Sequence, residues 1–374
     1  MGDGSLIMTL SMGPKLAVPV PAPVTDALQS VQVTTAAGQA SGFQLTFALS
    51  KPSLLNRVLL PTGVLDPGVR VIVTVVVNGR PSVLTDGIVT RQDVAPGATP
   101  GTSTLTLTGE DLTALMDLRD RTACYPGLSS DEQVKAVVLH YADYGIVPLA
   151  VPPVLREIPS PTERIQVQTD TDLGYVKTLA AQAGHVFYLE PGPVPGASIA
   201  YWGPEIRIGF PQPVLSVDMD AHTNVESLSF AFDGRARTQM TVTVTEPFTR
   251  RQIPVPVPDV GLLRPPLAAR QVRALRETPV PDTAKLTPLG AALVGLSMTA
   301  EASDAVTGQG RLDVLRYGHV LKARSLVGVR GAGPAYDGLF YVRSVTHDIK
   351  RGEYKQNFTL ARDGLVSQTP VVRP

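Results

Sequence analysis

Three polar residues spaced two apart, Asp218, Asp220 and His222, are the group in this sequence best suited to bind a metal ion. Side chains two positions apart on a strand project from one face, and two carboxylates with an imidazole can hold a divalent cation. The alternative is a strand end that leads into a polar turn continuing through Thr223 and Asn224. We expect the turn and assign no metal ligands.

A carboxylate pair and a single cysteine are the next candidates. Glu110 and Asp111 are adjacent, so they would diverge on a helix, and they indicate charge at a helix N-terminus rather than an acid–base pair. Cys124 has only Arg119 and Arg121 nearby in sequence to activate it. A buried, unreactive cysteine is therefore the expectation.

His347 lies in an alternating stretch near the C-terminal end, where its same-face neighbours are Val345 and Ile349. A general base needs a nucleophile or carboxylate beside it. We therefore expect a structural, hydrogen-bonding histidine, with an interface role or catalysis as alternatives. Arg343 and Arg362 flank the same stretch, and we expect them to pair with carboxylates or carbonyls of a partner protein.

The sequence contains no nucleophile elbow, zinc-protease, phosphate-loop or dinucleotide-binding motif. We therefore predict neither an enzyme nor a cofactor. Net charge is zero, with 33 basic and 33 acidic side chains, which disfavours nucleic-acid binding. One cysteine rules out an intrachain disulfide. No segment approaches a membrane helix or a secretory leader, so we expect neither membrane contact at rest nor ordinary secretion.

The elements that must position these residues are mostly strands. Hydrophobic residues make up 43% of the 374-residue chain and charged residues 18%, with 33 glycines and 34 prolines. Such a composition favours strands and turns, divided into two or three domains. Within residues 1–110 we predict strands at 6–12, 41–49, 69–77, 81–90 and 102–108, with a hairpin at Asn78-Gly79. About six short strands indicate a small barrel or sandwich.

After residue 110 the spacing of the apolar residues changes from the alternation of strands to the spacing of helices. We predict helices at 110–116, 130–145 and 171–183, and a strand at 185–190, which together indicate a small α/β insert. Strands return at 206–210, 214–219, 225–232 and 238–245. A proline- and arginine-rich excursion follows, with possible helices at 267–277 and 288–304. Further strands are expected at 310–313 and 320–329.

Residues 338–362 form the strongest pattern in the chain. Alternate residues of 339–349 fall on opposite faces of a strand, residues 350–353 supply a turn with Gly352, and 354–360 resume the alternation. This predicts a β-hairpin buried on one face and at least partly covered on the other.

The hairpin resembles the closing signature of the phage late control protein D family, the baseplate hub proteins of contractile tails and related spike proteins of type VI secretion and extracellular contractile injection systems. Supporting stretches begin at Tyr317 and Thr85. The residues that carry the resemblance are Gly338, Tyr341, Val342, His347, Tyr354, Phe358 and Arg362.

The resemblance implies two related antiparallel β-barrels that form a pseudo-sixfold ring as a homotrimer. The expected domains are 1–110 (a first, tube-facing barrel), 111–205 (an α/β insert), 206–245 with 310–366 (a second barrel), 246–309 (an inserted excursion) and 367–374 (an arm).

The resemblance further implies a structural hub that joins a hexameric inner tube to a threefold spike. Its partners would be the inner tube protein, a separate spike protein and baseplate wedge or adaptor proteins. It would be assembled in the bacterial cytoplasm and reside in the baseplate of a phage tail-like particle. The alternatives are a receptor-binding or adhesin-like tail protein and, third, a tail-associated cell-wall hydrolase.

Overall fold

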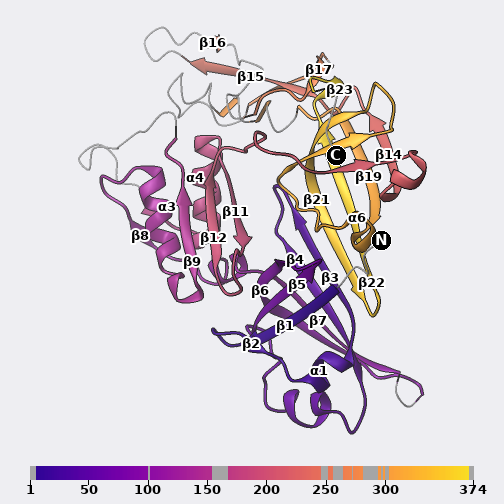
Figure 1. Ribbon diagram of the computed structural model, residues 1–374. Helices are drawn as coiled ribbons and strands as arrows, with labels where there is room; N and C mark the ends of the chain where they lie inside the picture. Colours follow the sequence, from indigo (N-terminus) through magenta and orange to yellow (C-terminus); the bar gives the residue numbers. More distant parts are fainter. Residues whose placement is uncertain are drawn as a thin grey trace.

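The computed structural model describes residues 6–99, 102–153, 167–245, 252–255, 264–271, 273–280, 294–295, 298–299 and 303–369. Two β lobes are stacked end to end, an α/β unit lies beside them, and short strands lie at the far end of the second lobe (Figure 1). Among the helices of these ranges, none is both long and apolar enough to cross a membrane.

The first lobe is a curved sheet with strand order β3-β4-β7-β6-β5-β1-β2. Asn78 and Gly79 both have positive φ, at 51° and 77°, as the turn between β5 and β6 requires. A short helix, α1 (Ala22–Ala27), and a π-helical turn, η1 (Leu55–Leu59), lie among the strands. Those strands are β1 (Leu6–Gly13), β2 (Val18–Pro19), β3 (Leu28–Ala36), β4 (Gly42–Leu49), β5 (Arg70–Val77), β6 (Arg80–Ala95) and β7 (Ser103–Asp111).

The second lobe has the strand order β14-β19-β22-β21-β20-β13. Its helical turns are η3 (Asp220–His222) and α6 (Val314–Tyr317), and Asp313 caps α6 by accepting from the backbone N–H groups of Leu315 and Arg316. Its strands are β13 (Gln212–Ser216), β14 (Val225–Phe232), β19 (Val306–Asp313), β20 (Leu326–Arg330), β21 (Gly338–Lys350) and β22 (Glu353–Arg362).

The two lobes repeat one strand order. Taken in chain order, β1, β3, β4, β5, β6 and β7 correspond to β13, β14, β19, β20, β21 and β22, and the spatial order of the two sets is then identical. The outermost pair differs in direction, because β1 pairs antiparallel with β5 whereas β13 pairs parallel with β20. The chain thus contains two copies of one five-stranded unit, each with an additional edge strand.

The irregularities of the two ladders also coincide. The β6–β7 register shifts between Val89 and Arg91, and the β21–β22 register shifts between Val342 and Ser344. When these two bulges are aligned, a row of residues across four strands of the first lobe corresponds to a row across four strands of the second. The first row passes through Val89, Gly109, Phe43 and Val33, and the second through Val342, Leu360, Gly308 and Phe230.

The same alignment also brings a second pair of bulges to equivalent positions. The β3–β4 shift begins at Leu28, five residues before Val33, and the β14–β19 shift begins at Val225, five residues before Phe230. Bulges bend and twist a sheet at defined points, so lobes that share them share their curvature. The repeat is therefore present in register as well as in strand order.

The lobes are joined by one ladder. The second half of β21 pairs antiparallel with β3, from Ser344 opposite Ala36 to Lys350 opposite Ser30. In Figure 1 the yellow β21–β22 hairpin runs down to the indigo strands of the first lobe. A single 13-stranded sheet results, which in the described residues runs open from β14 to β2, so hydrogen bonding closes neither lobe into a barrel.

The α/β unit follows the first lobe in the chain. The sheet order is β11-β12-β9, with β12 parallel to β9, and helices α3 and α4 pack against it. A capping box at Ser129 and Glu132 begins α3, and Thr171 caps α4. The elements are α2 (Thr113–Met116), β8 (Ala123–Cys124), α3 (Ser130–Leu139), η2 (Ala142–Tyr144), β9 (Ile146–Ala150), β10 (Val167–Gln168), α4 (Asp172–Ala183), β11 (Val186–Pro191) and β12 (Ser198–Gly203).

Short strands lie beyond the second lobe. β15 (Thr238–Thr245) pairs with β16 (Gln252–Val255) and β18 (Arg276–Pro279), and β17 (Ala268–Gln271) pairs with β23 (Gly364–Ser367). The possible helix at 267–277 is therefore wrong, because the backbone of this segment pairs with the end of the chain instead. Most of the possible helix at 288–304 lies outside the described residues.

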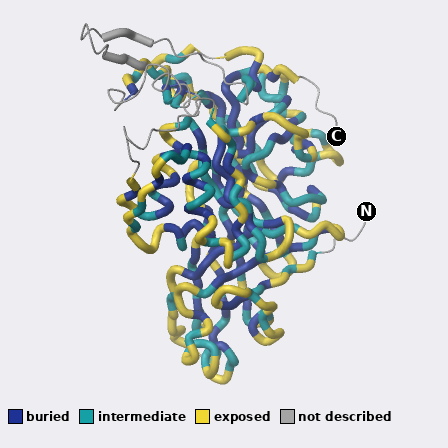
Figure 2. The backbone as a smooth tube through the Cα atoms, turned by 90° about the vertical axis from the view of Figure 1, so that its left-hand side faces the viewer, coloured by how far each residue is buried: buried dark blue, intermediate teal, exposed yellow. Residues whose placement is uncertain are grey.

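The hydrophobic core is continuous through both lobes, and a separate cluster around the wholly buried Trp202 lies within the α/β unit. Figure 2 shows the buried residues as a column through the two lobes, with exposed residues on the periphery. The mainly β prediction with an α/β insert is confirmed. The strand expected at 206–210 is irregular, and the helix expected from 110 begins only at Thr113.

Candidate interface: the junction between the two lobes

The β21–β22 hairpin turns through Arg351 and Gly352, and Gly352 has φ of 74°. The prediction of a hairpin buried on one face and partly covered on the other is confirmed: Tyr354 and Phe358, 0% and 3% exposed, lie in the main core, and Tyr341, 2% exposed, lies on the opposite face in a smaller apolar cluster. Val342 lies at the bulge and is wholly buried. The hairpin therefore contributes its aromatic side chains to the core of the molecule.

Gly338 begins β21 with φ of 109°, in the region that favours glycine. A Cβ atom at this position would lie 2.1 Å from Cβ of Ser367. The hydroxyl of Ser367 also accepts the N–H of Leu339, at 3.2 Å. Gly338 therefore allows the end of the chain to pack against the start of the hairpin.

The other face of the junction carries polar cross-strand pairs. The hydroxyl oxygens of Thr34 and Thr346 lie 3.1 Å apart, and Gln32 donates to Asp348 at 3.0 Å. Asn357 donates to the second carboxylate oxygen of Asp348, at 2.7 Å. Such pairs stabilise one register of a sheet.

His347 lies on the buried face of this junction and is 4% exposed. Its Nδ1 is 2.7 Å from the hydroxyl of Tyr354 and 3.2 Å from the amide nitrogen of Gln356. Gln356 also bonds both backbone groups of Leu321. Burial lowers the pKa of His347 to about 3, so the ring is neutral at pH 7 and serves as a hydrogen-bonding group in the core.

Arg324 ties three parts of the molecule together. Its guanidinium donates to the backbone oxygen of Ala36 in the first lobe at 2.8 Å and to Glu190 in the α/β unit at 3.3 Å. The same group lies 4.2 Å from the ring centroid of Tyr188. The side chain is 5% exposed, and the residue has φ of 59°. This role could not be predicted from local sequence, because the partners are more than 100 positions away.

The two arginines expected to contact a partner protein differ in location. Arg362 is 0% exposed, lies 4.2 Å from the ring centroid of Phe340, and donates to the backbone oxygens of Ala335, Asp337 and Gly364. The expectation of a partner contact is therefore corrected for Arg362, because its donors are already bound within the chain. Arg343 is exposed at the bulge of β21 and stays a candidate.

Two further buried ion pairs were missed from the sequence. Arg207 binds Asp304 through two bonds of 2.6 and 2.7 Å and lies 4.5 Å from the ring centroid of Tyr341. Arg70 binds Asp86 through two bonds of 2.7 and 2.6 Å. Arg70 also donates to backbone oxygens of the α/β unit, which attaches that unit to the first lobe.

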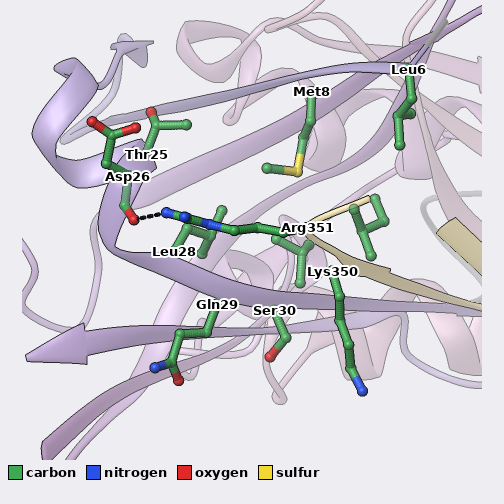
Figure 3. Close-up of a pocket in the computed structure, with 11 residues that line it drawn as sticks. Leu6, Met8, Thr25, Asp26, Leu28, Gln29, Ser30, Lys350 and Arg351 are labelled. Carbon is green, nitrogen blue, oxygen red and sulfur yellow. Dashed lines mark hydrogen bonds between the residues drawn. The ribbon is translucent and has the colours of Figure 1, made fainter. Parts of the chain in front are cut away.

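A pocket lies where the hairpin turn meets the first lobe (Figure 3). The side chain of Arg351 reaches across it and donates to the backbone oxygen of Asp26, while Lys350 points away. The side chains of Leu6 and Met8 from β1 form the apolar wall. The rest of the lining combines apolar residues with polar ones: Leu28, Val31 and Ile349, and Thr25, Gln29 and Ser30.

The other candidates from the sequence do not meet at this junction. Asp218, Asp220 and His222 are exposed in the turn between β13 and β14. No group of three His, Cys, Asp or Glu side chains in the described ranges is placed to hold a metal ion. The turn expectation matches the observed 3₁₀ segment.

At the start of the α/β unit, the expected charge at a helix N-terminus is confirmed only for Asp111, and the expectation of a buried Cys124 is wrong. Glu110 and Asp111 end strand β7, and Asp111 accepts the backbone N–H of Thr113 as the chain turns into α2. Cys124 is exposed rather than buried, because β8 is a two-residue strand with β10 as its one strand partner in the described residues.

Comparison with known proteins found no matching family model and no matching curated protein. Solved structures do match. A tail protein from Neisseria meningitidis MC58 is 15% identical, with 96% of this chain and 98% of that chain covered and a TM-score of 0.63. The 43 kDa tail protein of prophage MuSo2 from Shewanella oneidensis is also 15% identical, with coverage of 96% and 100% and a TM-score of 0.63.

A third match is the E. coli c3393 protein, described as a component of the type VI secretion system with structural similarity to the T4 tail proteins gp27 and gp5. It is 10% identical, with coverage of 93% and 77% and a TM-score of 0.54. These matches extend over nearly the whole chain and agree with the resemblance noted in the hairpin. The chain therefore has the fold of phage tail proteins and of this related type VI secretion component.

Proposed function

We propose that this chain is a structural baseplate hub of a phage tail or related contractile particle. Three copies form a ring of six β lobes that joins a hexameric inner tube to a threefold spike. The observation that carries the proposal is the internal repeat, in which two lobes share strand order, bulges and register. A chain with two equivalent lobes supplies two successive positions of a sixfold circle.

The junction between the lobes supports a mechanical role. Seven cross-strand residue pairs, a shared core and the contacts of Arg324 fix one lobe against the next. Such a connection holds two adjacent positions of a ring at a constant angle. The E. coli c3393 protein, whose fold this chain shares, is described as a component of the type VI secretion system, which agrees with the proposal.

The polar side chains of the hairpin support a structural role over a catalytic one. The side chains of His347, Gln356 and Arg362 are buried, and each is hydrogen-bonded within the chain. We assign the inner tube protein, a spike protein and wedge or adaptor proteins as partners. The first lobe faces the tube, and Arg343 is available for a partner contact.

The experiment is the measurement of mass for the purified chain, alone and mixed with the tube protein of its own particle. Native mass spectrometry and mass photometry should give assemblies of three chains of 39.7 kDa each, and a complex with tube hexamers. A chain, monomeric or trimeric, that does not bind the tube protein and binds cells or glycans by itself would be an adhesin-like tail protein and would overturn the proposal.

A further inference from the structure

The junction inside the chain leaves two strand edges without partners. In the second lobe, the first half of β21 pairs with β20 and the second half pairs on the same side with β3 of the first lobe. In the first lobe, β6 is the equivalent of β21. Its first half pairs with β5, and in the described residues no backbone pairing reaches residues 91–95 on that side.

The other unpaired edge is β14, the equivalent of β3. β3 pairs with β4 on one side and with β21 on the other, whereas β14 pairs with β19 and ends the sheet in the described part of the chain. Figure 1 shows the distal ends of β6 and β7 projecting from the first lobe as a two-stranded arm. An unpaired edge is a template for another strand.

We propose that residues 91–95 of β6 in one subunit pair antiparallel with residues 229–233 at the β14 edge of the next copy. This inference rests on the proposed ring and identifies the surfaces that close it. The contact is heterologous, because each subunit contributes one edge of each kind, and such contacts close into a ring when the rotation permits.

The bulges set the register of this contact. Within the chain, Ser344 follows the bulge of β21 and is opposite Ala36. The equivalent of Ser344 is Arg91, and the equivalent of Ala36 is Asp233. Continuing along the strands places Asp93 opposite Ala231 and Ala95 opposite Ser229. The first opposed pair therefore brings Arg91, which within its own chain forms an exposed ion pair with Asp93, to an aspartate of the next copy.

The apolar side chains at these edges agree with the register. Val94 is 49% exposed, although Leu105, its cross-strand neighbour on β7, is wholly buried. Phe232 is 42% exposed at the end of β14. The register sets Val94 opposite Phe230 and Gln92 opposite Phe232, on the face equivalent to the buried side of the internal junction.

Disulfide trapping tests the register. Ala37 N–H donates to the backbone oxygen of Arg343, which makes Ser344–Ala36 a non-hydrogen-bonded pair. Hydrogen-bonded and non-hydrogen-bonded pairs alternate along an antiparallel ladder, so Asp348–Gln32 is also a non-hydrogen-bonded pair. The equivalent pair is Ala95–Ser229, with Cα atoms expected about 4.5 Å apart, within the range of a disulfide. The variant carries Ala95→Cys and Ser229→Cys in a Cys124→Ser background, which removes the one native cysteine.

Mild oxidation of this variant should give covalent dimers and trimers on a non-reducing gel. The matched control pairs Ala95→Cys with Ser227→Cys, two residues out of register on β14, and should give at least tenfold less. A chain that is trimeric by native mass spectrometry but crosslinks no better than the control would refute the strand pairing and leave the ring standing. A monomeric chain contradicts the ring, and the inference falls with it.

A charge swap tests the same contact without cysteines. Arg91→Asp should raise the dissociation constant of the trimer at least tenfold, and adding Asp233→Arg should restore most of the loss. Circular dichroism checks that each variant is folded. No weakening by the single change, or no recovery in the double variant, would count against the Arg91–Asp233 contact and the register from which it follows.

Discussion

Arg362 illustrates how this chain keeps a cation in its interior. Burial lowers the pKa of Arg362 to about 10, which still leaves the guanidinium charged at pH 7. Three backbone oxygens accept its N–H groups, and the ring of Phe340 covers one side. A buried charge is tolerated when its hydrogen bonds are satisfied. Arg362 therefore fixes the loop before β21 rather than reaching outward.

Phe358 offers a direct test of the hairpin core. Its ring fills the space left by Gly310, where a Cβ atom would come within 2.5 Å of the ring. Phe358→Ala should lower the free energy of unfolding by about 3 to 5 kcal/mol, and Tyr341→Ala by about 3 kcal/mol, measured by urea denaturation. Phe210→Ala is the matched control, because Phe210 is fully exposed and its loss should change little.

Two buried histidines give the stability a definite pH dependence. Burial lowers the pKa of His347 to about 3 and that of His185 to about 4, from an ordinary value of 6.5. Below pH 6.5 these two histidines bind protons in the unfolded chain, whereas in the folded chain they stay neutral until the pH approaches their lowered pKa values. The contribution is therefore complete above pH 6.5 and is lost as the pH falls toward 4, by up to about 1.4 kcal/mol per pH unit for each histidine.

Urea denaturation at about pH 7, 6 and 5 should show this slope in the native chain. His347→Gln should make the slope shallower, even if the variant is less stable at pH 7. His222→Gln is the control, since His222 is exposed in the turn before β14 and should leave the slope unchanged. An equal slope in all three proteins would mean that His347 is not held neutral by burial.

Residue patterns could predict burial in the hairpin but not the partners of long polar side chains. Alternation indicated which residues in the second half of β21 face the core, but the bulge after Val342 reverses the faces in the first half; the apolar neighbours of His347 indicated a structural role. The contacts of Arg324 and Arg207 depend on segments that lie close only after both lobes have folded. Local sequence contains no signal for such contacts.

At the scale of elements, the strand that joins the lobes was the one missed. β3 does show alternation at Val31, Val33 and Thr35, but a bulge at its start interrupts the pattern, and no turn signal pairs it with a partner nearby. Strands with a glycine turn between them, such as β5 and β6, could be predicted. The pairing of β3 with β21, more than 300 residues later, could not.

Arg324 gives a prediction for the junction as a whole. Its equivalent in the first lobe is Gly68, because both donate their N–H to the residue before the bulge, Val342 or Val89, and both have positive φ. Arg324→Gly therefore keeps the backbone conformation and removes only the side chain. Loss of its charged hydrogen bonds should cost about 2 kcal/mol or more.

The measurement is urea denaturation of Arg324→Gly beside Lys177→Ala, an exposed position of α4 whose side chain has no hydrogen bond or ion pair in the described residues. The lysine variant should stay within about 0.5 kcal/mol of the native chain. Equal stability of the two variants would show that the three-way contact contributes nothing net.

For the whole molecule, the shared sheet and core imply that the two lobes unfold together. Hydrogen exchange followed by mass spectrometry should give peptides from β3, β4, β21 and β22 the same opening free energy, that of global unfolding. The α/β unit has its own core around Trp202 and can open separately. A first lobe that exchanges well before the second would contradict the idea of one rigid pair.

The overall plan of two β parts with an α/β unit between them could be predicted from composition and period. The family resemblance implied two related lobes, but the residues alone could not show the repeat, because its two copies share strand order and bulges rather than residues. Val89 corresponds to Val342, but Gly109 corresponds to Leu360 and Phe43 to Gly308. Backbone geometry is retained where side chains have changed, so coordinates were needed to see it.

The glycine at position 68 has a consequence for how a closed circle of three chains would fail under force. The junction between the two lobes of one polypeptide contains the contacts of Arg324. The equivalent junction between two polypeptides has Gly68 at this position, which has no side chain to contact the neighbouring subunit. Stronger and weaker junctions would therefore alternate around the circle. Tension would separate every second junction first and so release whole chains from the circle.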